Sequence, residues 1–117
     1  MNDDDRFRLG HMLEMAKFVE ATTSGKTRPD FDNDMVLQLA LTRAVEIIGE
    51  AASKVSDDLQ HSLPQIPWAS IIGMRNRLIH AYFKIDLDVM WNTITESVPI
   101  LIIELEQLLQ ADSGNPE

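Results

Sequence analysis

The spacing of apolar residues constrains the fold most, because they recur every three or four positions and no segment alternates with a period of two. Residues three and four apart share one face of an α-helix, whereas residues two apart share one face of a strand. The clearest apolar stripe consists of Leu37, Leu41, Ala44, Ile48, Ala51, Ala52 and Val55. The sequence therefore predicts an all-α chain without a sheet.

Caps and helix breakers divide this chain into four long helices. Acidic and amide side chains favour helix starts, and proline suits a first turn but disturbs a helix interior. The first helix is expected to end at about Thr22, and Pro99 is expected to bend the last. The expected starts of the second, third and fourth helices are Asp32 or Asn33, Pro67, and Asp86 or Asp88. Four helices with short connections predict an antiparallel four-helix bundle.

Length and composition fit one domain. A chain of 117 residues is long enough for one core, and we expect a single helical domain over residues 1–111 and a frayed tail over 112–117. There is no cysteine, and the three histidines are scattered, so no metal site or other cofactor is expected. The sequence lacks an apolar run of about 18 residues and begins with acids, which predicts a cytoplasmic protein without membrane contact.

One segment departs from the overall charge. The chain carries 19 acids and 10 bases, a net charge of −9, yet no carboxylate lies between Asp58 and Asp86. The ionisable side chains in this window are Arg75, Arg77, Lys84, His61 and His80, together with the phenol of Tyr82. A locally positive patch on an acidic protein suits an anion, and phosphate is the commonest candidate.

Arg75 and His80 are the candidate chemical groups of this window. Arginine presents a planar fork of donors that fits phosphate, and histidine can take or give a proton near neutral pH. The pair therefore suggests metal-independent RNA cleavage. On one straight helix, however, Arg75 and Tyr82 would nearly align while His80 would point away. Either the helix ends near His80 or two copies of the segment meet across a dimer, and we expect both.

The sequence Arg75-Asn76-x-x-x-His80-x-Tyr82 resembles the R-x4-H-x-Y motif of the HEPN superfamily, specifically its HepT-like ribonuclease toxins. The resemblance covers roughly residues 5 to 110. Further segments that match the family in type and order are 43–52, 66–68, 72–76 and 85–86.

This resemblance implies a function, partners and site residues. It implies a homodimeric toxin of a type VII-like toxin–antitoxin system that cleaves cellular RNA, tRNA among the substrates of the family. Arg75 and His80 would be catalytic, and Asn76 and Tyr82 would support them. The implied antitoxin is a nucleotidyltransferase that transfers AMP from ATP to Tyr82.

A second function class is also consistent with the sequence. The chain could be a non-catalytic dimeric helical module that accompanies a nucleotidyltransferase or binds a nucleotide, because an acidic surface suits a protein partner better than RNA. Arg43, Glu46 and Glu50 lie on one helix face, which is either a solvated salt-bridged face or an aid to a site across a dimer. After Lys84 there are seven acids and no base, which indicates a solvated face or a basic partner.

Overall fold

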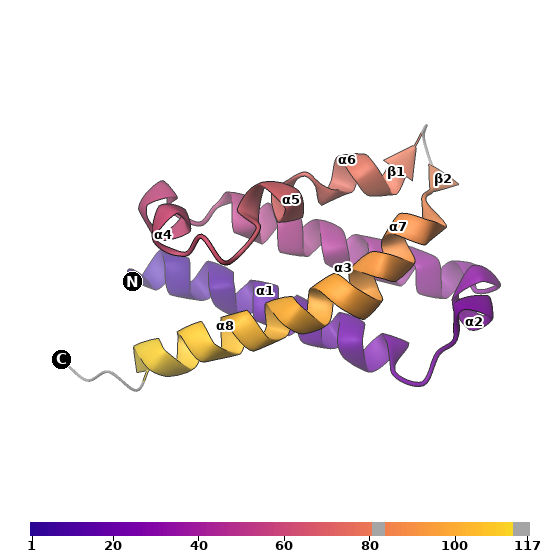
Figure 1. Ribbon diagram of the computed structural model, residues 1–117, viewed down its shortest axis with the longest axis horizontal. Helices are drawn as coiled ribbons and strands as arrows, with labels where there is room; N and C mark the ends of the chain where they lie inside the picture. The colour runs from indigo at the N-terminus through magenta and orange to yellow at the C-terminus, as the bar shows by residue number, and fades with distance from the viewer. Residues whose placement is uncertain (81–83, 114–117) are drawn as a thin grey trace.

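The computed structural model describes residues 1–80 and 84–113, and at Arg75, Ile79, His80 and Ser113 it describes the backbone alone. The chain runs along the long axis of the molecule four times, in alternating directions (Figure 1). The first two passes are α1 (Asp3–Thr23) and α3 (Met35–Ser53), and the third contains α5 (Trp68–Ile72) and α6 (Met74–Leu78). The fourth pass contains α7 (Leu87–Asn92), the π-helix η1 (Thr93–Ser97) and α8 (Val98–Ser113). The predicted all-α class is confirmed.

Two short helices connect these passes, and they move one predicted boundary. Thr27 caps the start of α2 (Arg28–Asp32), and its side chain and that of Asp30 form a reciprocal capping box. Because α2 takes up Asp32, α3 starts later than predicted, and Asp34 caps it by accepting a hydrogen bond from the Leu37 amide at 3.0 Å. α4 (Asp57–Ser62) lies in the segment after α3.

The core lies where α1 packs against both α3 and α8. Leu9 and Met12 of α1, Leu41 of α3 and Leu105 of α8 are fully buried there, as the apolar spacing predicts. One polar contact joins the start of α1 to the start of α4. The buried Asp5 carboxylate accepts hydrogen bonds from the Ser56 backbone N at 2.9 Å and from its Oγ at 2.7 Å.

The third pass differs from the long helix that the sequence analysis expects. It contains two five-residue helices separated by Gly73, a weak helix former that ends α5. The chain then forms a two-residue antiparallel ladder between β1 (Ile79–His80) and β2 (Lys84–Ile85). The expectation of no β-structure is therefore wrong for this one ladder, which is too short to give a period-two pattern in the sequence.

The fourth pass is interrupted beside Pro99. Proline has no amide hydrogen, and inside an α-helix its ring crowds the carbonyl four residues back. The neighbouring Val98 amide donates to the Thr93 carbonyl, five residues back, so the turn before the proline is a π-turn. The predicted disturbance at Pro99 thus takes the form of a wider turn.

Several apolar side chains lie on the surface in groups. Met35, Val36 and Leu39 are exposed on α3, and Ile100 and Ile103 are exposed on α8. In residues 1–80 and 84–113, none of the helices combines the length and the hydropathy that crossing a bilayer requires.

Candidate functional site

The motif occupies the end of α6 and the ladder that follows it. We call residues 68–85, of which 68–80 and 84–85 are described, the motif segment. Arg75 lies on α6, which ends at Leu78, so the backbone leaves the helix before His80 in β1. This matches the expectation that the helix ends near His80. Tyr82 lies outside the described residues. In Figure 1, the ladder is at the end of the molecule opposite the N-terminus and the C-terminal end of α8.

A close approach of two helices positions the motif segment on α3. A Cβ placed on Gly49 of α3 would lie only 3.1 Å from the Ile71 carbonyl oxygen of α5. Glycine at this position therefore lets the α5 backbone contact α3 directly. Trp68 fixes the start of α5, because its Nε1 donates to the Leu63 carbonyl at 3.0 Å while its side chain is buried.

Arg77 holds α6 against α5. Its Nη2 donates to the Ser70 carbonyl at 2.7 Å and to the Ser70 Oγ at 2.8 Å. Positions two apart differ by about 200° around a helix, so position 77 lies on the side of α6 away from position 75. Arg77 thus braces the two short helices from an exposed position, and the neighbouring Asn76 is exposed as well.

The ladder fixes where the chain returns after the motif. His80 pairs in register with Lys84, and Ile79 pairs with Ile85. Directly after the ladder, the Asp86 amide donates to the Leu78 carbonyl at 2.6 Å. The Asp86 carboxylate, one of the two predicted caps, then caps α7 by accepting from the Val89 amide at 3.1 Å. The exposed Lys84 side chain brings a positive charge to the strand opposite His80.

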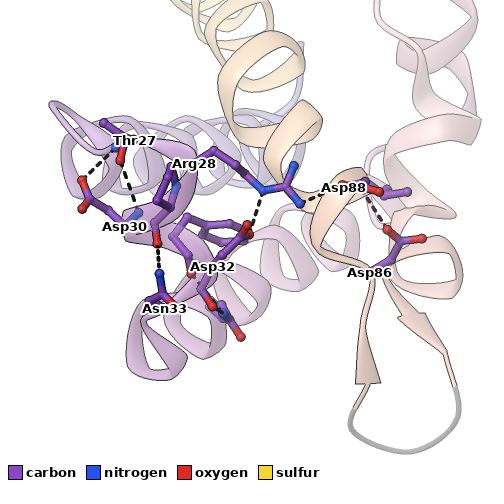
Figure 2. A network of polar contacts seen from close by, with 11 residues as sticks. Thr27, Arg28, Asp30, Asp32, Asn33, Asp86 and Asp88 are labelled. Atoms are coloured by element: carbon purple, nitrogen blue, oxygen red, sulfur yellow. Dashed lines mark hydrogen bonds and ion pairs between the residues drawn. The ribbon is translucent and has the colours of Figure 1, made fainter.

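An ion-pair network that the sequence analysis does not predict holds α7, the helix that follows the ladder, against α2. Figure 2 shows the Arg28 guanidinium between two carboxylates, with Nε 2.7 Å from Asp32 and Nη2 2.7 Å from Asp88 of α7. The hydrogen bond to Asp32 and then that to Asp88 raise the pKa of Arg28 above its ordinary value. Phe31 and Trp91 add a ring contact with centroids 5.5 Å apart. The four-residue spacing of Arg28 and Asp32 is the one sequence signal of this network.

The remaining candidate residues lie elsewhere. His61 is exposed on α4, at the other end of the molecule from the ladder, with Nδ1 2.8 Å from the Asp57 carbonyl oxygen (Figure 1). On α3, Arg43 lies 4.0 Å from Glu46 and 3.8 Å from Glu50, so these three form the salt-bridged face predicted as one alternative. Within the described residues, no group of three or more His, Asp or Glu residues could hold a metal ion.

Fold and motif together define a small helical protein with a candidate phosphate site at one end. The chain matches the family model described as Ribonuclease HepT-like over residues 12–108. "Probable ribonuclease HepT" of Thermococcus cleftensis is 39% identical over 100 residues, which cover 86% of this chain and 91% of that protein. No solved structure gives a significant match.

Two further relatives agree. "Putative RNase TTE0752" of Caldanaerobacter subterraneus subsp. tengcongensis is 35% identical over 104 residues, covering 89% of this chain and 93% of that protein. "Putative RNase MJ1380" of Methanocaldococcus jannaschii is 38% identical over 98 residues, covering 84% of this chain and 90% of that protein. The chain therefore belongs to the HepT-like ribonuclease family.

Proposed function

We propose that the protein is a metal-independent endoribonuclease in which Arg75 and His80 are the catalytic residues. The observation that carries this proposal is the R-x4-H motif of a HepT-like chain, with Arg75 on α6 and the His80 backbone beyond the end of that helix. The absence of any carboxylate from residues 59 to 85 supports it, because a substrate phosphate meets no negative side chain of this segment.

The reaction follows from the two side-chain types. His80 takes the proton of a ribose 2′-hydroxyl, whose oxygen forms a bond to the adjacent phosphorus while the bond to the 5′-oxygen breaks. Arg75 stabilises the negative charge that develops on the phosphoryl oxygens. The leaving 5′-oxygen receives a proton, so the products are a 2′,3′-cyclic phosphate and a 5′-hydroxyl end. Asn76, exposed on the same helix, supports substrate binding as a hydrogen-bonding amide.

The protein acts as a homodimer of one domain over residues 1–111, in which the four passes form an antiparallel four-helix bundle. Exposed apolar side chains favour self-association, because Met35 and Val36 of α3 are 71% and 78% exposed. Leu39 continues this surface along α3, the helix on which α6 packs. A dimer through α3 would bring two motifs close together. Light scattering at micromolar concentration should give the mass of two chains, and a monomer mass would contradict the proposal.

The partner is a nucleotidyltransferase antitoxin of a type VII-like system in the cytoplasm, and its target is Tyr82. The Tyr82 oxygen attacks the α-phosphorus of ATP and releases pyrophosphate, which leaves AMP on the phenol. The added phosphate then competes with RNA phosphate for Arg75 and Lys84. Co-expression with the transferase should add one or more AMP masses, and Tyr82→Phe should abolish the addition. AMP on the phenylalanine variant would refute this assignment.

Cleavage of an RNA substrate by purified variants tests the catalytic roles. Arg75→Ala and His80→Ala should each lower the rate by at least about a hundredfold. His61→Ala is the matched control, since His61 lies in the same acid-free window but on α4, and it should retain the wild-type rate. Cleavage should persist in EDTA. Loss of activity in EDTA that a divalent ion restores would overturn the mechanism.

The net charge of −9 favours a second candidate, the non-catalytic module that binds a protein partner. The two candidates differ in the same assay. The module predicts no cleavage by the wild-type protein at any salt concentration, together with retained binding of the transferase by His80→Ala. The ribonuclease predicts cleavage that disappears in His80→Ala.

A further inference from the structure

The register of the ladder places Lys84 beside the candidate site. β1 and β2 run antiparallel, with His80 directly opposite Lys84. Residues that are directly opposite in an antiparallel pair lie on the same face, with Cβ atoms about 4.5–5.5 Å apart. The hydrogen bond from the Asp86 amide to the Leu78 carbonyl, at 2.6 Å, continues the pairing and holds this register. Positions 80 and 84 therefore share one face of the ladder.

The Lys84 ammonium is open to an anion. Lys84 is exposed, and none of the side chains that the structure describes forms an ion pair or a hydrogen bond with it. The two carboxylates that follow it, Asp86 and Asp88, are engaged at the start of α7 (Figure 2). Asp86 caps that helix, and Asp88 lies 2.7 Å from the Arg28 guanidinium. The positive charge of Lys84 is therefore not used within the described part of the protein.

Arg77, the other cation of the motif segment whose side chain is described, is already engaged. Its Nη2 donates to the Ser70 carbonyl at 2.7 Å and to the Ser70 Oγ at 2.8 Å, and it lies 3.6 Å from the Met74 sulfur. These contacts direct the guanidinium toward α5 rather than toward the ladder. Two cations of the same acid-free window therefore have different surroundings.

We propose that Lys84 is a further active-site residue, which binds the phosphate of the RNA bond that is cut, whereas Arg77 takes no part in substrate binding. This inference rests on the proposed function, because that function supplies the phosphodiester. The flexible four-carbon stem of a lysine lets its ammonium reach a phosphate on which His80 acts from the opposite strand. The ammonium stabilises the negative charge that develops on the phosphoryl oxygens.

A 2′-O-methyl RNA oligonucleotide tests this contact without cleavage. It lacks the free 2′-hydroxyl that the proposed reaction needs, so it stays intact. Fluorescence anisotropy of the labelled oligonucleotide gives the Kd of the full-length protein at several salt concentrations. For a single strand, the slope of log affinity against log salt concentration changes by about 0.7 for each phosphate contact, because each contact releases counterions.

Four variants separate a local contact from a general effect of charge. Lys84→Met should weaken binding about five- to tenfold at low salt and make the slope shallower by about 0.7. Lys84→Arg keeps the charge and should keep the slope. Lys54→Met is the matched control, because it removes the same charge from an exposed lysine at the end of α3. Lys54→Met and Arg77→Met should both keep the wild-type slope.

Circular dichroism confirms that each variant is folded before its binding is compared. A wild-type Kd and slope in Lys84→Met would overturn the proposal, as would failure of the wild-type protein to bind the oligonucleotide at low salt. Equal weakening by Lys54→Met would also overturn it, because the effect would then be one of net charge. A shallower slope in Arg77→Met would contradict the different roles of the two cations.

A cleavage assay keeps this proposal distinct from the ribonuclease proposal. Cleavage by the wild-type protein, together with unchanged binding by Lys84→Met, would refute the Lys84 contact alone. Weakened binding by Lys84→Met, together with no cleavage by the wild-type protein, would support the phosphate contact and refute the ribonuclease.

Discussion

The helical body, formed by α1, α3, η1 and α8, and the motif segment are built by different interactions. The body consists of long helices whose apolar stripes meet in a continuous core, with Leu9, Leu41 and Leu105 fully buried. The motif segment consists of five-residue helices and a two-residue ladder. It has only a few buried anchors, such as Trp68 and Leu78, and otherwise depends on single polar and backbone contacts.

The two regions also differ in charge, since each helix of the body carries acids whereas residues 59 to 85 carry none. A regular helix cannot direct residues five apart to the same side, because five steps turn about 500°. A chain that brings an arginine and a histidine of the same copy together at this spacing therefore has to leave the helix between them. We infer from this difference that the body provides most of the stability of the fold. The motif segment is less regularly packed because its backbone leaves the helix within the motif.

The largest expected loss of stability comes from a core substitution in the body. Leu105→Ala should lower the free energy of unfolding by about 2–5 kcal/mol, because a fully buried leucine leaves a cavity between long helices that relax little. Leu78→Ala removes an equally buried side chain from α6, and its cost should lie at the lower end of that range, since a short helix can collapse into the space. Urea denaturation measures both. A larger loss of stability for Leu78→Ala than for Leu105→Ala would show that the motif segment is packed more rigidly than the body.

The next largest change in stability is expected where α5 of the motif segment contacts α3 of the body. Gly49→Val would place side-chain atoms against the Ile71 carbonyl, where a Cβ alone is already 3.1 Å away, and should cost about 1–3 kcal/mol. Gly10→Ala is the opposite case, because no atom lies within 4 Å of its added Cβ, and should stabilise α1 by about 0.5–1 kcal/mol. Thermal unfolding should therefore shift in opposite directions. A neutral Gly49→Val would show that α5 moves freely on α3.

Arg77→Ala tests whether one side chain braces the motif segment. The two hydrogen bonds from Nη2 to Ser70 are lost, which should cost about 0.5–1.5 kcal/mol because the arginine is exposed. If the ribonuclease proposal holds, kcat should fall about tenfold with little change in KM, since α6 is displaced rather than a substrate contact removed. Arg8→Ala on α1 is the control and should leave kcat unchanged. An unaltered kcat in Arg77→Ala would remove the bracing role.

The sequence predicts the body well because its elements are periodic. The first helix, expected to end at about Thr22, ends at Thr23, and Asp86, one of the two caps predicted for the last helix, caps α7. These features depend on residues that are close together in the sequence, so they can be read from the sequence alone. The same reasoning predicts the ionic face of Arg43 and Glu50.

The motif segment is harder to predict because its structure depends on contacts between distant residues. Gly73 signals a weak point in a helix, but the break there is coupled to Gly49, more than twenty positions earlier, where α5 packs on α3. The Arg28–Asp88 ion pair and the hydrogen bond from Asp86 to Leu78 likewise join separate elements. Motif residues can therefore be identified from spacing, whereas their supports require the three-dimensional arrangement.

The smallest effect concerns an ion pair at the end of the body farthest from the motif. Arg6 Nε donates to the Asp112 carboxylate at 2.7 Å and thereby joins the start of α1 to the end of α8. The hydrogen bond from Arg6 lowers the pKa of Asp112 below its ordinary value of 3.8. A carboxyl group whose folded pKa is lowered stabilises the protein above its unfolded pKa, and this contribution disappears as the pH falls through the folded value.

Asp112→Asn should therefore reduce the stability of the protein slightly at pH 7, and the difference should be smaller at pH 2, because the wild-type carboxyl becomes protonated as the pH falls through its folded pKa. The effect at pH 7 should shrink further in high salt, because the pair is on the surface and is screened. Urea midpoints of both proteins at the two pH values measure the difference. RNA cleavage at pH 7 should be the same for both proteins, since the pair contacts only the body. A stability difference as large at pH 2 as at pH 7, or a change in cleavage, would show that Asp112 acts beyond this pair.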